Sequence, residues 1–122
     1  MTVARKLQIR PGMTVVLLGR PSGIDLEIPS ECLVVSDPAD AATADAVVAF
    51  VVGAEELDSV AEPALQAARD DRLAWIAYPQ NRQLGTDLNR DVLAALATER
   101  GTQPVRQIAI DGVWSALRFR PA

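Results

Sequence analysis

The segment "AVVAFVVGAEELDSVAEPALQAARDDRLAWIAY", Ala46 to Tyr78, decides the fold. Its two apolar runs, Ala46 to Gly53 and Leu73 to Tyr78, are typical of strands buried on both faces of a sheet. Between them, apolar residues recur at helical spacing, which predicts an amphipathic helix: Leu57, Val60, Ala61, Ala64, Leu65 and Ala68. A strand, a covering helix and a second strand predict a parallel pair in an α/β sheet.

Pro63 interrupts the predicted helix on its polar side. Because proline lacks a backbone N–H and restricts the residue before it, two outcomes are open. Either the helix kinks, or it breaks and Pro63 opens a second segment. The apolar spacing continues across Pro63, which favours the kink.

Two further strands and a helix are expected on either side of this unit. Apolar runs at Thr14 to Gly19 and Cys32 to Asp37 predict the strands, again buried on both faces. The short link between them allows either a tight parallel crossover or an antiparallel return, so the strand order stays open. The helix is expected from about Leu88 to Arg100, with Gly101 placed to end it.

The closing segment "PVRQIAIDGVWSALRFRP" predicts a hairpin, because Asp111-Gly112 between alternating segments is typical of a two-residue type I′ turn. Such a turn places on one face Ile108, Ile110, Val113, Ser115, Leu117 and Phe119. It places on the other face Gln107, Trp114, Arg118 and Arg120. The expected fold is a single α/β domain over residues 1–122: a small, three-layer, Rossmann-like or methyltransferase-like sheet, mainly parallel, with a C-terminal antiparallel hairpin.

The composition excludes several classes of function. The 122 residues include no histidine and one cysteine, so Ser-His-Asp and Cys-His catalysis and the common zinc and iron–sulfur sites are excluded. That cysteine, Cys32, begins an apolar run and is expected to be a small buried side chain. No metal and no cofactor is expected.

Charge and hydropathy bound the partners and the location. The net charge is -4 and no run of basic residues is present, which argues against nucleic acid and anionic membranes as partners. The longest apolar run, Ala46 to Val52, is far shorter than a membrane span. The first residues lack the apolar core of a secretory signal, so we expect a cytoplasmic protein.

The stretch "IRPGMTVVLLGRPSG", Ile9 to Gly23, resembles the opening of a class I methyltransferase, where Pro-Gly leads into a strand and a glycine-rich loop. That resemblance implies an S-adenosylmethionine site built from an acidic strand end and closely spaced glycines. Here Leu17 and Leu18 occupy the acidic region, and three residues separate Gly19 from Gly23. No helix follows to supply free N–H groups. The pattern indicates a nucleotide-fold shape without its cofactor chemistry.

Polar residues gather where two of the predicted strands end, and ligands of open parallel sheets bind beyond the carboxyl ends of the strands. The candidate ligand-binding residues are Arg20, Ser22, Tyr78, Gln80, Asp87, Asn89, Arg90 and Asp91. We propose no catalytic residue among them.

A structural interpretation competes for the same residues. Thr86 or Asp87 can cap the following helix, and Asp87 can pair with Arg90 on its surface. Tyr78 can pack in the core with one hydrogen bond. Asn89 and Asp91 border the apolar stripe and are expected to turn partly toward the sheet.

Trp114, Arg118 and Arg120 form a second candidate site on one face of the hairpin. Tryptophan and arginine concentrate at interface hot spots, so this face is a candidate homodimer interface. Alternatively a helix covers the face, Trp114 belongs to the core, and the arginines extend outward to water.

Several segments together resemble a family of small bacterial proteins described only as a domain of unknown function: "PGMTVVLLG", "AVVAFVV", "LAWIAYP", "TDLNRDVL" and "PVRQIAIDGVWSALRFRP". The match spans nearly the whole chain, and "TDLNRD" and "WSALRFRP" are its most specific parts. In that family a lysine often follows Tyr-Pro, where this chain has Gln80, so a function that uses the lysine is lost or changed here. The resemblance implies a fold and a bacterial, cytoplasmic setting.

Two hypotheses of function follow. The first is a non-catalytic binding or interaction domain with a degenerate nucleotide-fold shape, which forms a homodimer or binds a protein partner. The second is a small enzyme or binder of a small anionic molecule that uses the polar residues between Tyr78 and Asp91, with Arg20 or Arg90 holding the anionic group. Carboxylates can act as acid or base where burial raises a pKa, so the lack of histidine only narrows the chemistry.

Overall fold

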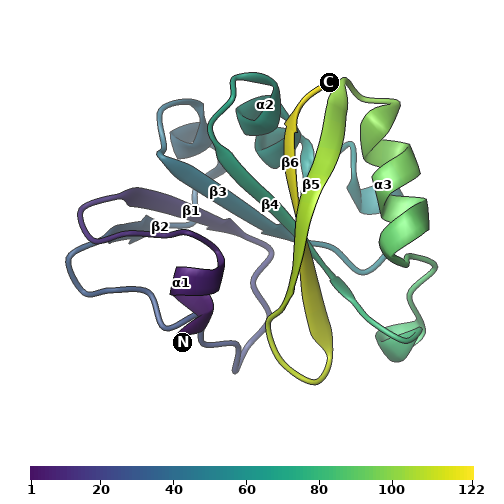
Figure 1. Ribbon diagram of the computed structural model, residues 1–122, viewed down its shortest axis with the longest axis horizontal. Helices are drawn as coiled ribbons and strands as arrows, with labels where there is room; N and C mark the ends of the chain where they lie inside the picture. Colours follow the sequence, from purple (N-terminus) through teal and green to yellow (C-terminus); the bar gives the residue numbers. More distant parts are fainter.

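The computed structural model describes residues 1–122 and centres on a six-stranded sheet in the order β2-β1-β3-β4-β6-β5 (Figure 1). The parallel strands are β1 (Thr14–Leu18), β2 (Leu33–Val35), β3 (Ala46–Phe50) and β4 (Leu73–Pro79). The antiparallel portion consists of β6 (Trp114–Pro121), which pairs with β4, and β5 (Thr102–Ala109). The predicted α/β class, parallel core and antiparallel C-terminal hairpin are therefore confirmed.

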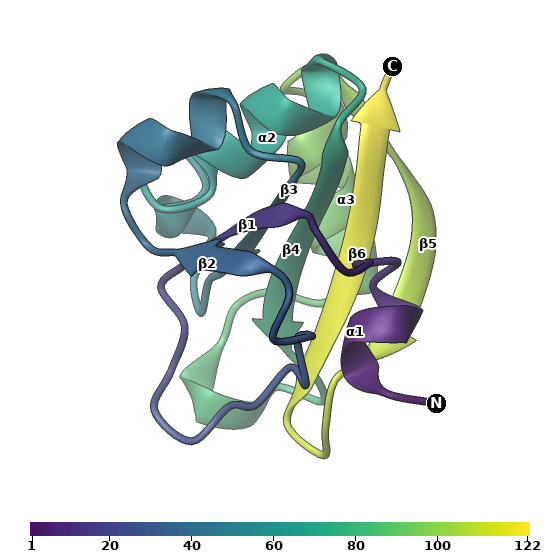
Figure 2. The same ribbon diagram turned by 90° about the vertical axis from the view of Figure 1, so that its left-hand side faces the viewer.

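Helices lie on both faces of the sheet (Figure 2). One face packs against α2 (Glu62–Arg69), α3 (Arg90–Thr98) and the 3₁₀ helix η1 (Pro38–Ala42). The other face is covered by α1 (Val3–Lys6) and by residues of the loop between β1 and β2. Two shorter 3₁₀ helices, η2 (Ala54–Glu56) and η3 (Gln83–Gly85), follow β3 and β4. None of these helices combines the length and apolar composition that crossing a bilayer requires.

Alternation along each strand divides the core into two clusters, because successive side chains of a strand point to opposite faces. Val47 and Ala49 of β3 face α2, whereas Val48 and Phe50 face α1. On the α1 face, the fully buried Trp75 donates its indole N–H to the carbonyl oxygen of Leu7 at 2.9 Å. This bond holds the N-terminal segment against the sheet.

The continuous, kinked helix predicted across Pro63 is wrong. The chain forms η2, then a turn, and α2 begins only at Glu62, with Pro63 in its first turn. In that position the missing N–H of proline removes no helical hydrogen bond, so the break costs less than an interior kink. Leu57 and Ala61 nevertheless stay fully buried, which explains why the apolar spacing continues across the break.

The predicted two-residue type I′ turn is also wrong. Ile110 pairs with Trp114 through a 2.9 Å backbone hydrogen bond, so the loop has three residues, and the Asp111 carboxylate accepts from the backbone N–H groups of Val113 and Trp114, at 2.8 Å each. This one-residue shift puts Trp114 on the same face as Ile110 instead of the opposite face.

Trp114 is therefore a core residue of the α1 face. It is 4% exposed and packs edge-on against Phe50, with ring centroids 5.5 Å apart. The covered-face alternative describes it correctly, and its ring is not available to a homodimer interface.

The second predicted strand differs from expectation in burial. It forms β2 at the edge of the sheet, parallel to β1, and its side chains Leu33 and Val34 are 61% and 44% exposed, so burial on both faces is wrong. Cys32 is half-buried and its thiol donates to the carbonyl oxygen of Arg10 at 3.1 Å. The parallel crossover is the alternative that the structure supports.

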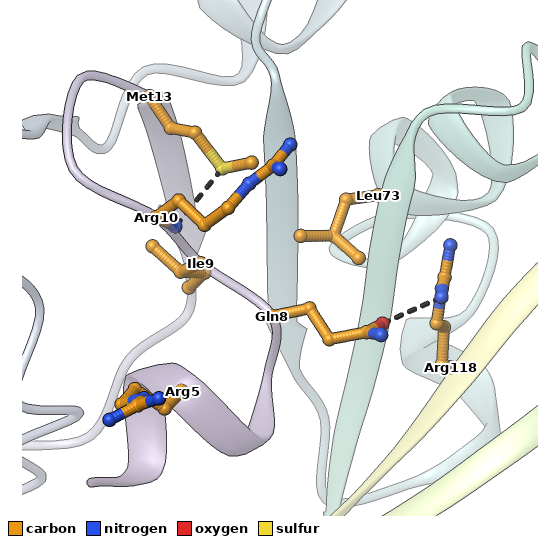
Figure 3. A pocket seen from close by; sticks show the side chains of 7 residues that line it. All are labelled: Arg5, Gln8, Ile9, Arg10, Met13, Leu73 and Arg118. Atoms are coloured by element: carbon orange, nitrogen blue, oxygen red, sulfur yellow. Dashed lines mark hydrogen bonds between the residues drawn. The ribbon is translucent and has the colours of Figure 1, made fainter.

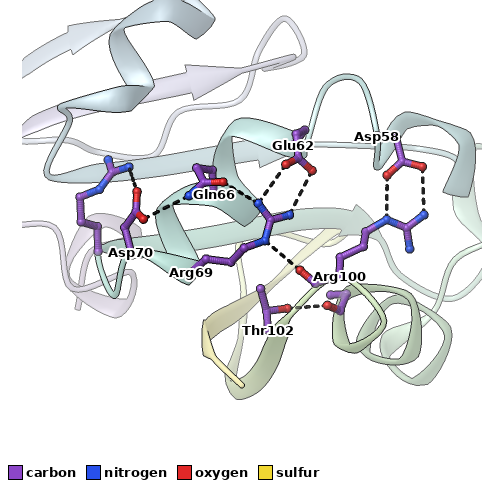
Figure 4. A network of polar contacts seen from close by, with 9 residues as sticks. Asp58, Glu62, Gln66, Arg69, Asp70, Arg100 and Thr102 are labelled. Atoms are coloured by element: carbon purple, nitrogen blue, oxygen red, sulfur yellow. Dashed lines mark hydrogen bonds and ion pairs between the residues drawn. The ribbon is translucent and has the colours of Figure 1, made fainter.

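Ion pairs and hydrogen bonds join α2, α3 and the start of β5 (Figure 4). Arg100 contacts both oxygens of Asp58, at 2.8 and 3.0 Å, and Arg69 contacts Glu62 at 3.0 Å. Arg69 also donates to the backbone oxygen of Arg100 at 2.9 Å, and the buried Thr102 hydroxyl donates to the Ala97 carbonyl at 2.7 Å. The contacts attach α3 to α2 through side chains.

We expect this network to make stability sensitive to acid. The hydrogen bond from Arg100 lowers the pKa of Asp58, and the hydrogen bond from Arg72 lowers the pKa of Asp70. A carboxyl with a lowered folded-state pKa stabilises the fold above its unfolded pKa, near 4, and loses that contribution as the pH falls. Arg100→Gln should flatten the decline in the free energy of unfolding between about pH 5 and pH 2. Urea titrations at each pH measure the free energy of unfolding. If its decline with falling pH were the same in the variant and the wild type, Arg100 would not be the cause of the acid sensitivity.

Trp75→Phe should lower the free energy of unfolding by about 1–3 kcal/mol, because the buried Leu7 carbonyl loses its donor. Trp114→Phe is the matched control, since it removes a similar ring area without an indole hydrogen bond of this kind. Equal losses in the two variants would show that the hydrogen bond contributes nothing beyond packing.

Candidate functional site

Tyr78, a predicted ligand-binding residue, lies buried at the carboxyl end of β4. It is 2% exposed, and its hydroxyl oxygen accepts a hydrogen bond from the Gln107 side chain at 3.1 Å. Burial raises the pKa of Tyr78, which favours the neutral phenol. Its arrangement is that of a core residue with one hydrogen bond.

Gln80 connects β4 to the hairpin turn. Its amide nitrogen donates to the Gly112 carbonyl at 3.1 Å, and its amide oxygen accepts from the Ser115 hydroxyl at 2.8 Å. Both ends of the side chain therefore hold protein groups.

The helix caps differ from those predicted. Asn89 is the N-cap of α3 and accepts from the backbone N–H of Val92 at 2.8 Å, so the predicted capping by Thr86 or Asp87 is wrong. The buried Thr86 hydroxyl donates to the Val52 carbonyl and accepts from the Leu88 N–H. These contacts place the start of α3 two residues later than predicted.

Arg90 and Asp91 form an exposed pair at 3.2 Å, with 62% and 84% of their side chains exposed. The predicted pair of Asp87 with Arg90 is therefore replaced by a pair of neighbours. Asn89 and Asp91 are both exposed, so their predicted turn toward the sheet is wrong.

Backbone donors beyond β3 are occupied by the protein's own carboxylates. Glu56 accepts from the N–H groups of Val52 and Gly53, at 2.7 and 3.2 Å. Asp87 accepts from the N–H of Ala54 at 2.9 Å. An external anion at this edge would have to displace these internal ones.

Arg20 and Ser22 lie apart from this cluster. Arg20 donates to the Ile24 carbonyl at 2.7 Å and lines a hollow between β1 and β2, which shares no residue with the hollow beside Asp87. Ser22 is exposed. Gly19 has φ +68, and a Cβ there would lie 2.8 Å from the Phe50 carbonyl oxygen, so this glycine serves the close approach of β1 and β3. The predicted residues do not converge on one cavity.

We call the edge of the sheet where the parallel strands end the carboxyl edge. We expect its residues to contribute to the free energy of unfolding. Asn89→Ala should lower the free energy of unfolding by about 1 kcal/mol through the lost cap. Asn89→Asp can still cap the helix and should retain most of the free energy of unfolding that Asn89→Ala loses. Chemical denaturation of the two variants measures the difference. A loss from Asn89→Ala no larger than that from Asn89→Asp would contradict the role of the side chain as the cap.

The largest cavity lies at the opposite edge, where the parallel strands begin (Figure 3). Met13 precedes β1, Leu73 begins β4, and the cavity measures about 520 Å³. We call it the arginine pocket; it is lined by Arg5, Gln8, Ile9, Arg10, Met13, Leu73 and Arg118.

Two distant parts of the chain build this pocket. The N-terminal segment supplies five of its seven lining residues, one from α1 and four from the residues that follow it. Leu73 comes from β4, and β6 supplies Arg118, opposite Trp75 on the neighbouring strand. The Gln8 amide oxygen accepts from Arg118 Nη1 at 2.6 Å across 110 residues of sequence. The pocket therefore depends on the N-terminal segment lying on the sheet.

The arginines of the pocket have no carboxylate partner. All ion pairs of the structure use other arginines, namely Arg69, Arg72, Arg90, Arg100 and Arg120. Arg118 is partly buried, and its Nε–H is the one buried side-chain polar atom without a hydrogen bond. Burial lowers the pKa of Arg118, and Arg120 and Arg106 lower it further against the opposing effect of Asp71. Positive charge is concentrated here without an internal counter-charge.

The sequence interpretation missed Arg5, Gln8 and Arg10, and it placed Arg118 in an interface with Trp114. One available signal was the density of positive charge between residues 5 and 10 of an acidic chain: Arg5, Lys6 and Arg10. Arg120, the third predicted interface residue, is half-exposed and pairs with Asp71 at 3.2 Å.

No protein-family model matches the chain, and no curated protein sequence matches it significantly. The two family resemblances noted in the sequence therefore stay predictions.

Proposed function

We propose that the protein is a non-catalytic binding domain that takes up a small anionic molecule in the arginine pocket. The observation that carries the proposal is the placement of Arg5, Arg10 and Arg118 around one cavity, each without a carboxylate partner. In a chain of net charge -4, carboxylates are plentiful, yet they pair with arginines elsewhere. Guanidinium groups bind carboxylate and phosphate oxygens in pairs of parallel hydrogen bonds, which suits a small anion.

The arrangement of the carboxyl edge gives less support to the alternative, a small enzyme or anion binder between Tyr78 and Asp91. Gln80 and Asn89 hold backbone or side-chain groups of the protein. The backbone N–H groups after β3 already donate to the carboxylates of Glu56 and Asp87. No side chain there combines burial, a shifted pKa and a free hydrogen-bonding position facing a cavity, as catalysis by an acid or base needs.

The proposal includes a Rossmann-like, methyltransferase-like relationship and a cytoplasmic location. The order β2-β1-β3-β4 is the 2-1-3-4 order of one common doubly wound sheet. The occupied donors at the carboxyl edge agree with a nucleotide-fold shape whose cofactor chemistry is lost. No cofactor is therefore part of the proposal.

Thermal unfolding in citrate, matched in ionic strength with sodium chloride, tests the proposal. If citrate binds only the folded state, a citrate concentration of ten times the Kd stabilises that state by about 1.4 kcal/mol, which raises Tm by several degrees. Arg118→Met should abolish this rise, because it removes the charged group that the cavity partly buries.

Arg120→Met is the matched control. This substitution removes one positive charge from the same strand. Arg120 itself lies outside the pocket and is paired with Asp71. Arg90→Ala tests the carboxyl edge in the same way. Equal loss of the Tm rise in all three variants would mean that citrate acts on net charge, and the assignment to the pocket would be wrong.

A homodimer stays a prediction from the sequence. Trp114 is buried within the monomer, so it provides no support for one. Light scattering at high protein concentration measures the oligomeric state directly.

A further inference from the structure

The charged groups of the arginine pocket do not meet at one point. In Figure 3 the guanidinium groups of Arg5, Arg10 and Arg118 stand apart around the cavity, with Arg10 and Arg118 on either side of Leu73. A single compact anion could contact only one or two of them. A ligand with two separated anionic groups could contact groups on both sides.

Gln8 leaves some of the hydrogen-bond donors of Arg118 without an acceptor. Its amide oxygen accepts from Nη1 at 2.6 Å, and the buried Nε–H of Arg118 has no acceptor. The amide is neutral, so it leaves the charge of Arg118 without compensation. A carboxylate or phosphate has two or more acceptor oxygens and a negative charge, and it can accept from two guanidinium donors at once.

The backbone of Gln8 adopts a left-handed conformation. Gln8 follows Leu7, the C-cap of α1, and has φ +64, a left-handed conformation that favours glycine after a helix. A non-glycine residue there is strained. The side chain of this residue forms the hydrogen bond to Arg118.

The middle of the pocket is apolar. Ile9, Met13 and Leu73 supply its hydrophobic lining, and Leu73 stands between the charged ends of Arg10 and Arg118 in Figure 3. A short hydrocarbon spacer would cover these side chains, whereas a fully polar ligand would not.

We propose that the ligand is a small organic dianion with two carboxylate or phosphate groups on a short apolar spacer. One anionic group binds Arg118 and displaces the amide of Gln8, the other binds Arg10, and the spacer lies over Leu73 and Met13. Gln8 is then a neutral placeholder on Arg118, and the need to displace it sets the affinity for the ligand. This assignment of the ligand rests on the proposed function.

Titration calorimetry with matched ligands tests the two charges. Glutarate has two carboxylates and pentanoate has one on the same five-carbon chain, and ionic strength is held constant with sodium chloride. Wild-type protein should bind glutarate at least tenfold more tightly than pentanoate. Equal affinities for the two would overturn the dianion assignment.

Variants at Gln8 test the displacement. Gln8→Glu supplies an internal carboxylate to Arg118 and should weaken glutarate binding at least tenfold. Gln8→Gly removes the competitor and relieves the left-handed strain, so its glutarate affinity should equal or exceed that of the wild type. Thermal unfolding without ligand verifies that each variant folds. Unchanged glutarate affinity in both variants would overturn the placeholder role.

The outcomes separate this inference from the proposed function. If wild-type protein binds none of citrate, glutarate and pentanoate, the anion-binding function itself is wrong. If it binds citrate in a manner that depends on Arg118 but does not distinguish glutarate from pentanoate, the function stands and the dianion assignment fails.

Discussion

The hydrogen bond from the indole of Trp75 to the carbonyl of Leu7 is the contact on which the α1 face of the structure depends. It joins the first helix to a central strand across 68 residues of sequence, in a fully buried position. Ala4 and Ile9 pack around it in the same apolar cluster. Because Gln8 and Arg10 adjoin these anchored residues, the bond also determines where the N-terminal side of the arginine pocket lies.

Arginine has two different roles on the two sides of the molecule. Arg69 and Arg100 are paired with carboxylates, Arg69 within α2 and Arg100 with Asp58 in the turn before α2. Arg69 also donates to the backbone oxygen of Arg100, which links α2 to the end of α3. At the amino edge of the sheet, Arg118 contacts only an amide oxygen. Exposed ion pairs contribute little to stability, so the paired arginines chiefly orient the helices. A buried N–H group without an acceptor costs free energy, so Arg118 does not add to the stability of the fold through this group.

The sequence predicted the elements of the fold better than their registers and ends. Apolar runs identified all four parallel strands. For β1, β3 and β4 the reason is that a strand buried within a sheet needs side chains that suit both faces, whereas the apolar side chains of the edge strand β2 are largely exposed. The turn after Ile110 was predicted wrongly because the Asp111 carboxylate binds two backbone N–H groups, a contact that a dipeptide pattern does not reveal. That one residue reversed the face assigned to Trp114. Pro63 was misjudged because burial of Leu57 continues outside the helix.

The arginine pocket could not be predicted in the same way. Its residues come from positions 5 to 13, 73 and 118, and only the docking of the N-terminal segment brings them together. The candidate residues near Tyr78 were chosen because ligands of parallel sheets usually bind at the carboxyl edge. That rule concerns where backbone donors are free, and here Glu56 and Asp87 occupy them.

These two observations lead to one conclusion about how the chain can bind an anion. At the carboxyl edge of a nucleotide-binding fold, recognition rests on backbone N–H groups and a helix N-terminus, which act at short range. In the binding that we propose for the amino edge of this protein, recognition rests on guanidinium charges, one of them partly shielded from water. Binding by exposed charged side chains weakens with ionic strength, whereas binding at the shielded Arg118 is screened less. The salt dependence of affinity therefore reports how much of the anion's binding comes from Arg118 and how much from Arg5 and Arg10.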